Sequence, residues 1–143
     1  MVEMLVALVV LAVGMLGVAS LFATALHSGS SAIARMQAVN LASDIADRIR
    51  ANRRAGNAYA GAAANNNCAG AGAVSCSPAL MAANDIYLWQ RQLTQALGGA
   101  APTGSIACLP CAPTTPATYT ITVNWTEKSG QQTYQLQIQV PTN

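Results

Sequence analysis

One stretch of the chain decides its fold: MVEMLVALVVLAVGMLGVASLFATAL, residues 1–26. The stretch is almost wholly apolar, its single charge is Glu3, and the next charged residue is Arg35. About 20 consecutive apolar residues are enough to cross a bilayer as a helix. A carboxylate within such a span costs about 2.5–3.5 kcal/mol on insertion scales, so Glu3 requires a neutralising partner. The stretch therefore predicts a membrane-spanning helix.

Three interpretations of this stretch compete. A cleavable secretory signal carries basic residues ahead of a short apolar core, and no basic residue precedes Arg35. A plain single-pass anchor explains the apolar run but leaves Glu3 without a purpose. The third interpretation is a helix that first spans the membrane and later packs against similar helices. Gly14, Gly17 and Ser20 stand three residues apart, which allows close helix approach but is common in membrane spans generally.

The same stretch resembles the N-terminus of type IV pilins and pseudopilins, in particular minor pilins of the PilV type. The resemblance is strong at the N-terminus, over Val2–Gly14, and continues over Gln37–Asn52. Beyond Asn52 it is loose, over Trp89–Leu93 and Ile121–Glu127. It implies a mature chain in which a methylated Phe and one further residue precede Met1, after removal of a basic leader. It also implies an α+β fold, with a long N-terminal helix packed on a small antiparallel sheet.

The resemblance implies a structural role. PilV-type proteins join other minor pilins in a short complex that primes pilus assembly and lies near the tip. The expected partners are other minor pilins and the major pilin, with a tip adhesin as a further candidate. The expected location is the inner membrane, with the domain in the periplasm, and later the pilus at the cell surface. Two alternatives are a minor pseudopilin of a type II secretion system and a membrane-tethered thiol oxidoreductase.

The composition agrees with a subunit that is buried among neighbours. Charged residues make up 8% of the chain, against the usual ~25%, and the formal net charge is only +2. The residues after the apolar stretch are rich in Ala, Gly, Asn, Gln and Thr. A surface with so few charges suits contact with other subunits. The alternative is a soluble periplasmic domain with a neutral polar coat.

Four cysteines, an even number, are typical of a disulfide framework in a small exported domain. Three pairings are open. The local ones are favoured because each closes a short loop flanked by Gly, Ala or Pro, and they join Cys68 to Cys76 and Cys108 to Cys111.

The pattern after the apolar stretch predicts one domain over residues 29–143. Residues 29–54 are expected to form an amphipathic continuation of the first helix, which Ser28–Ser31 could bend or locally melt. The helix would present an apolar face and two ion pairs, Asp44–Arg48 and Asp47–Arg50. The residues of the apolar face are Ile33, Met36, Leu41, Ile45 and Ile49.

Residues 55–83 are expected to be a disulfide-stapled loop, since Gly, Ala and Asn dominate them. A second helix follows at 84–98, capped by Asn84 or Asp85 and ended by Gly98–Gly99. Trp89 lies on its apolar stripe and is expected in the core.

Residues 104–141 predict an antiparallel sheet. Apolar residues alternate with Thr and Gln along two runs, Thr118–Thr126 and Tyr134–Val140, and Glu127–Gln131 forms the turn between them. Gly104–Cys108 is a weaker third strand. The resulting hairpin must pack on a helix to be stable, and residues 32–52 are the expected partner.

The remaining motifs do not favour an enzyme. Cys108-Leu109-Pro110-Cys111 has redox spacing, but the Pro-rich segment 112–116 does not favour the helix that would activate the first thiol. The single histidine, His27, is expected at the level of the lipid headgroups. We find no catalytic, metal-binding, cofactor-binding or small-molecule motif. The arginines from Arg48 to Arg54 could contact phosphate, but no aromatic residue interleaves with them, so nucleic acid is not favoured.

Overall fold

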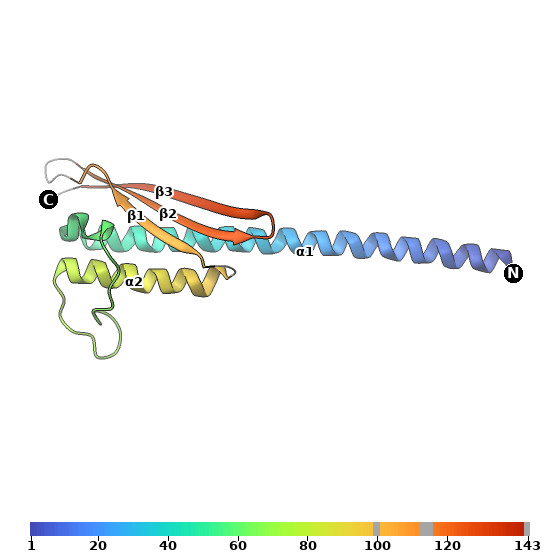
Figure 1. Ribbon diagram of the computed structural model, residues 1–143, viewed down its shortest axis with the longest axis horizontal. Coiled ribbons are helices and arrows are strands. Elements are labelled where there is room, and N and C mark those ends of the chain that lie inside the picture. The colour runs from blue at the N-terminus through green and yellow to red at the C-terminus, as the bar shows by residue number, and fades with distance from the viewer. Residues whose placement is uncertain (99–100, 112–115, 142–143) are drawn as a thin grey trace. The chain divides into compact units, whose positions relative to one another are not determined.

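The computed structural model describes residues 1–98, 101–111 and 116–141, apart from the side chain of His27 (Figure 1). Gly99 and residues 112–115 of the Pro-rich segment lie outside the described residues. The chain forms two compact units, residues 1–34 and 35–143. The architecture is α+β, as predicted. Its elements are α1 (Val2–Ala51), the 3₁₀ helix η1 (Arg53–Ala60), α2 (Pro78–Leu97), β1 (Thr103–Cys108), β2 (Ala117–Glu127) and β3 (Gly130–Val140).

Helix α1 continues through Ser28–Ser31, so the expected interruption there is wrong. A Ser or Gly inside a helix costs only about 0.5–1 kcal/mol relative to Ala. Strong helix formers on both sides compensate for that cost. The two ion pairs expected on α1 are present, from Arg48 to Asp44 at 3.0 Å and from Arg50 to Asp47 at 2.6 Å.

The second half of α1 enters the core through small residues. Ala38, Ala42 and Ala46 are fully buried, together with Ile45 and Ile49. Ile33 and Met36, which were expected on this face, are 54% and 58% exposed. Hydrophobicity alone predicts that the larger side chains are buried. Other elements approach α1 closely at the alanines, so the alanines form the buried face instead.

Helix α2 begins at Pro78, earlier than predicted, and Asn84 and Asp85 do not cap it. The cap is Ser77, whose hydroxyl accepts a hydrogen bond from the Leu80 N–H at 3.3 Å, with Pro78 in the first helical turn. Ser followed by Pro is a standard helix start. Asn84 and Asp85 lie inside the helix, where both are buried.

The expected loop also contains η1, which buries Ala55 and Tyr59. Gly56 at φ 53° and ψ −130° kinks η1 in a conformation that favours glycine. The chain from Gly61 to Ser77 has no regular structure.

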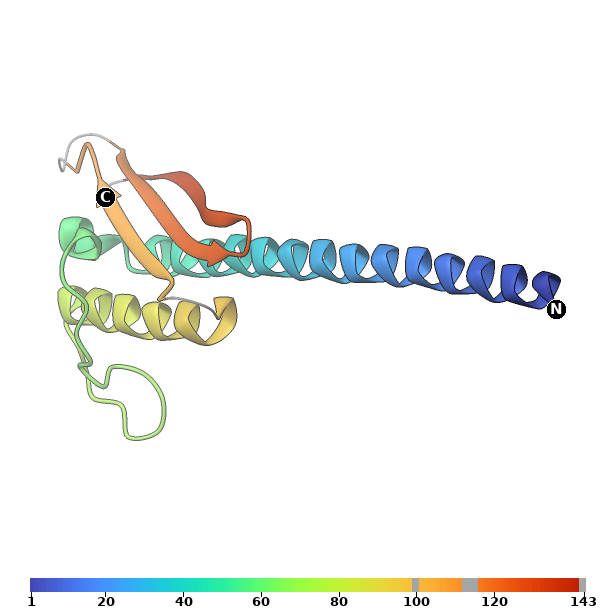
Figure 2. The same cartoon turned by 45° about the vertical axis from the view of Figure 1, so that its right-hand side comes forward.

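The sheet has the order β1-β2-β3, with both pairs antiparallel (Figure 2). Glu127 pairs with Gly130 across a two-residue turn, and the register then runs without interruption to Ala117 and Val140. Strand β1 pairs with β2 from Thr103 to Cys108, which confirms the weaker third strand predicted at Gly104–Cys108. The inner row of β2 is buried as predicted, and its residues are Tyr119, Ile121, Val123 and Trp125.

Within the second unit, the sheet covers the second half of α1 and α2, which lie side by side (Figures 1 and 2). Trp89 of α2 is fully buried, as predicted, and its indole N–H donates to the Leu41 carbonyl of α1 at 2.9 Å. Gly104 of β1 lies directly over Trp89 and Leu93: a Cβ added there would come within 2.5 Å of Trp89 Cη2. The missing side chain of Gly104 allows β1 to approach α2 this closely.

Candidate assembly site

The first unit has no interior. Every residue from Met1 to Leu26 is exposed, although the segment is almost entirely apolar. By length and composition, α1 could cross a membrane. An apolar helix with all its sides exposed is unstable in water, because burial of apolar surface is the main source of folding energy. Its partners must therefore be lipid or other helices.

Glu3 lies in the first turn of α1 and is exposed. The N-terminal end of a helix carries about half a positive charge, which favours a carboxylate at this position by about 0.3–1 kcal/mol. This gain would not offset the insertion cost of a carboxylate carried to the centre of a membrane or of a bundle of apolar helices, which is about 2.5–3.5 kcal/mol at a helix centre. A separate positive group would therefore be needed to neutralise Glu3 in an apolar environment.

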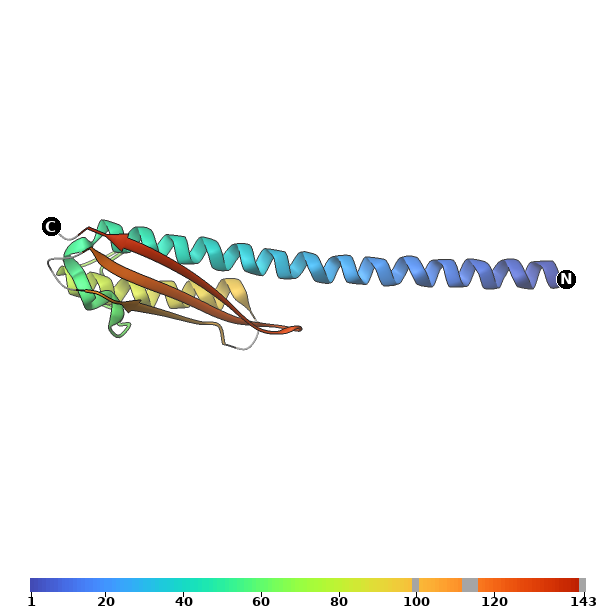
Figure 3. The ribbon, with the colours of Figure 1, turned by 90° about the horizontal axis from the view of Figure 1, so that it is seen from above.

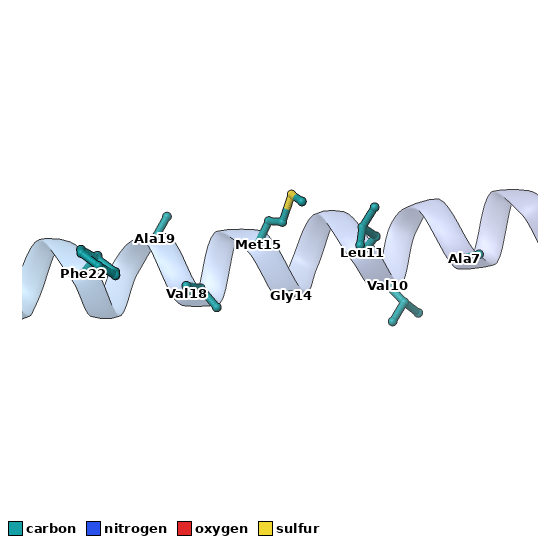
Figure 4. A pocket seen from close by; sticks show the side chains of 8 residues that line it. All are labelled: Ala7, Val10, Leu11, Gly14, Met15, Val18, Ala19 and Phe22. Carbon is teal, nitrogen blue, oxygen red and sulfur yellow. The ribbon is translucent and has the colours of Figure 1, made fainter.

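A shallow apolar groove runs along one face of this segment (Figure 4). Val10 and Val18 point to one side of the helix, Leu11 and Met15 to the other, and Gly14 lies between them without a side chain. The lining is completed by Ala7, Ala19 and Phe22. This groove could receive a row of side chains from a second helix.

Gly14 and Gly17 leave open space on the surface of the helix. Among the described residues, a Cβ added to either glycine would meet no heavy atom within 4 Å, apart from its chain neighbours and the adjacent helix backbone. Packing against the described part of the chain therefore requires neither glycine. Of the two, only Gly14 lines the groove.

A partly buried polar network joins the end of α1 to η1 and α2. The guanidinium of Arg48 donates to Asp44 at 3.0 Å and to Asp85 at 3.2 Å. The Tyr59 hydroxyl donates to the second carboxylate oxygen of Asp85 at 2.7 Å. Asn52 donates to the Pro78 carbonyl at 2.9 Å. The Asp44–Arg48 pair was predicted. Its extension to Tyr59 and Asp85 was not, because only the tertiary fold brings these residues to Arg48.

The network also changes the ionisation of Tyr59. Burial, and then its hydrogen bond to the Asp85 carboxylate, raise the pKa of Tyr59 above the usual value for tyrosine. Burial also raises the pKa of Tyr119 in the sheet. Burial and the Asp85 carboxylate therefore favour the neutral form of the Tyr59 phenol.

Both local disulfides are present, Cys68–Cys76 and Cys108–Cys111, with Cα–Cα distances of 5.7 and 5.6 Å. Asn84 accepts hydrogen bonds from the Asn66 and Cys68 N–H groups at 3.0 and 3.4 Å, which fixes the first loop on α2. Cys108 is the last residue of β1 rather than the first of a helix. It therefore lacks the helix terminus that would stabilise a reactive thiolate.

The arginines from Arg48 to Arg54 differ in whether they form ion pairs. Arg48 and Arg50 have aspartate partners, but Arg53 and Arg54 have none among the described residues. They line a pocket of about 450 Å³ beside Tyr119, whose hydroxyl donates to the Gly56 carbonyl at 2.9 Å.

The outer face of the sheet carries no charge. Side chains on this face bond to one another, with Thr133 donating to Asn124 at 2.8 Å and Gln135 donating to Thr122 at 3.3 Å. The outer face consists of Thr103, Ser105, Ala107, Thr118, Thr120, Thr122, Asn124, Thr126, Gln131, Thr133, Gln135, Gln137 and Gln139.

In the described part of the chain, no group of three potential metal-ligating side chains comes together.

Comparison with known families gives one match. Residues 20–87 match the family model of the type IV pilin Tt1218-like family. The match runs from the end of the apolar segment to the middle of α2, and supports a type IV pilin-like structural subunit that assembles with other pilins. Comparisons with curated proteins and with solved structures gave no significant match.

Proposed function

We propose that this chain is a minor pilin of the PilV type, which joins other minor pilins in a complex that primes a type IV pilus or lies at its tip. The observation that carries the proposal is the exposed apolar half of α1 with its single carboxylate, next to a segment that matches a type IV pilin family. The chain is held in the inner membrane before assembly and is transferred to the filament afterwards. This role needs no catalytic group.

Glu3 has a defined task in this proposal. Its carboxylate pairs with a positive group of a neighbouring subunit, most simply the N-terminal amine. Such a pair removes the cost of a lone carboxylate among apolar helices. The pairing also sets the axial position of one helix against the next, because Glu3 is the only charge in the apolar segment.

Affinity and selectivity come from different parts of the chain. The apolar helix supplies most of the affinity, since the groove at Gly14 allows a second helix to approach closely. The uncharged surface of the sheet, including Gln135, Gln137 and Gln139, selects the neighbour through hydrogen bonds. The major pilin and other minor pilins are the proposed partners, and a tip adhesin is a further candidate.

A minor pseudopilin of a type II secretion system is the second candidate, because the same architecture would serve that machine. A thiol oxidoreductase is the third candidate, and it depends on Cys108 and Cys111 alone. The position of Cys108 at the end of a strand argues against this third role.

Deletion of the gene distinguishes the three roles. For a minor pilin, the number of surface pili falls while synthesis of the major subunit continues, and the full-length gene restores piliation. Normal pili with failed secretion across the outer membrane would establish the pseudopilin role instead. Normal pili and normal secretion with impaired periplasmic disulfide formation would establish the oxidoreductase role.

A further inference from the structure

Strand β3 lies at the edge of the sheet, with β2 as its only strand partner among the described elements (Figure 3). It is 11 residues long, and all 11 pair with β2 in one continuous register. Its other side is therefore an unpaired edge as long as the strand itself.

The unpaired backbone groups of this edge can be assigned. Gly130 pairs directly with Glu127 across a two-residue turn, so the even-numbered residues of β3 hydrogen-bond to β2. The odd-numbered residues point their N–H and C=O groups away from β2. No other described segment bonds to them. These groups form the β3 edge, which consists of the backbones of Gln131, Thr133, Gln135, Gln137 and Gln139.

The β3 edge lacks the features that normally protect an edge strand. Proteins block such edges with charged side chains, proline, bulges or very short strands. Between Gly130 and Val140 there is no charge, no proline and no bulge. The nearest charges are Glu127 and Lys128, in and beside the turn.

The apolar row beneath the sheet also continues to this edge without full cover. On β2, Ile121 and Val123 are completely buried. Their partners on β3, Leu136 and Tyr134, are only partly buried. One more strand beyond β3 would pair the free backbone groups and cover these two side chains.

We infer that the β3 edge binds an extended segment of a different pilin-type subunit, which adds a fourth strand to the sheet. The inference rests on the proposed function for the identity of the partner. Alternating N–H and C=O groups at strand spacing are satisfied by another extended backbone. The segment would be uncharged over the paired stretch and would alternate apolar with polar residues.

A second copy of the chain fits this edge less well. Strand β3 and the second half of α1 run in the same direction (Figure 1). Antiparallel pairing of two β3 strands would therefore set the second halves of the two α1 helices in opposite directions. Subunits with the same membrane topology cannot adopt that arrangement easily.

Gln135→Pro in the full-length chain tests the inference. It removes one outward N–H and obstructs the edge, but breaks no backbone hydrogen bond between β3 and β2. The side-chain bond from Gln135 to Thr122 is lost, as it is in the Ala control. Gln135→Ala is the matched control, because it keeps the N–H and removes the side-chain amide. We expect Gln135→Pro to lower the recovery of other pilin-type subunits from detergent-solubilised native membranes by about tenfold. Gln135→Ala should lower it far less, because it removes only the side-chain amide and leaves the backbone edge intact.

Two further measurements keep the test decisive. Thermal melting by circular dichroism checks that both variants fold. If Gln135→Pro does not fold, Gln135→Lys replaces it, because a charged side chain also blocks an edge strand. Amide hydrogen exchange compares residues 130–140 in the chain alone and in the recovered complex, with protection of the odd-numbered amides expected.

Each outcome decides a different claim. Equal recovery for Gln135→Pro and wild type overturns the inference, and so does equal loss for both substitutions, which would assign binding to the outer face. A homodimer that Gln135→Pro disrupts also overturns it. If the wild-type chain never enters pili but its β3 edge is protected by another subunit, the proposed function fails and the edge inference stands.

Discussion

In the proposed function, Glu3 is the residue whose chemistry most directly links this chain to assembly. We expect Glu3→Ala to insert into membranes as well as wild type or better, because about 2.5–3.5 kcal/mol of insertion cost disappears. We also expect it to enter filaments poorly, because the intersubunit ion pair is lost. Membrane fractionation measures insertion, and immunoblotting of sheared pili measures incorporation.

Glu3→Gln and Glu3→Asp are the matched controls. Gln keeps the size and removes the charge, so it should behave like Ala. Asp keeps the charge and should retain part of the incorporation. Normal incorporation of Glu3→Ala or Glu3→Gln would contradict the ion pair.

Tyr59 gives the domain a pH dependence. Its pKa is raised in the folded state, so the neutral phenol is favoured by folding. This contribution is complete below the unfolded pKa of about 10 and is lost as the pH rises from there towards the folded pKa. We therefore expect the melting temperature to fall above about pH 10.

Tyr59→Phe tests this dependence. The variant should be less stable by about 1.5–3 kcal/mol at neutral pH, since a hydrogen bond to a carboxylate is lost, and its melting temperature should fall less steeply above pH 10. Tyr134→Phe, at the partly exposed edge of the sheet, is the matched control for removal of a tyrosine hydroxyl. An unchanged slope in Tyr59→Phe would assign the alkaline loss to another group, with Tyr119 the first to examine.

At the scale of elements, the contact of β1 with α2 depends on Gly104. Gly104→Ala should destabilise the domain by about 1–3 kcal/mol, because its Cβ would overlap Trp89 and Leu93. Ser105→Ala, on the opposite face of the same strand, should be nearly neutral. Chemical denaturation of both variants gives the comparison, and equal stabilities would mean that β1 can move away from α2 at little cost.

The two disulfide loops yield a direct chemical prediction. Peptide mapping under non-reducing conditions should recover Cys68 joined to Cys76 and Cys108 joined to Cys111. Each closure should stabilise the fold by less than the usual 2–4 kcal/mol, because the loops are short. A Cys68–Cys108 peptide would refute the pairing, and free thiols would also refute export to an oxidising compartment.

At the scale of the whole molecule, the division into two units predicts separable properties. A chain that lacks residues 1–28 should be soluble and fold cooperatively, since all of the buried core residues lie after Arg35. It should bind its partner subunits far more weakly than the full-length chain in detergent. Circular dichroism tests folding and co-purification tests binding, and equal affinity of the two forms would place the main interface in the domain.

Several features of this protein could be predicted from local sequence alone. The apolar run of Met1–Leu26 predicts a membrane-spanning helix because Glu3 is its only charged residue and the run is longer than the about 20 residues needed to cross a bilayer. Apolar residues alternate strictly with polar ones around Ile121 and Val123. This alternation predicts strand β2 and its buried face, because successive side chains of a strand point to opposite faces. The local disulfide pairs are predicted because each closes a short loop flanked by Gly, Ala or Pro, and both bonds are present in the structure.

Other features depended on tertiary contacts. The start of α2 at Pro78 was recognisable from Ser77–Pro78, but the buried positions of Asn84 and Asp85 were not, because their partners are distant in sequence. The exposure of Ile33 and Met36 and the burial of Ala38 and Ala42 follow from how closely other elements approach α1, which hydrophobicity does not report.

The sequence by itself determined the α+β class, the apolar helix with its one carboxylate, the strand pattern and the absence of charge on the outer sheet face. These properties depend on residue type and spacing along the chain. Only the tertiary structure decided that Arg48, Tyr59 and Asp85 form one network, that Gly104 admits Trp89, and that β3 is an open edge. These depend on distances between residues far apart in sequence, which are set by packing the whole domain at once.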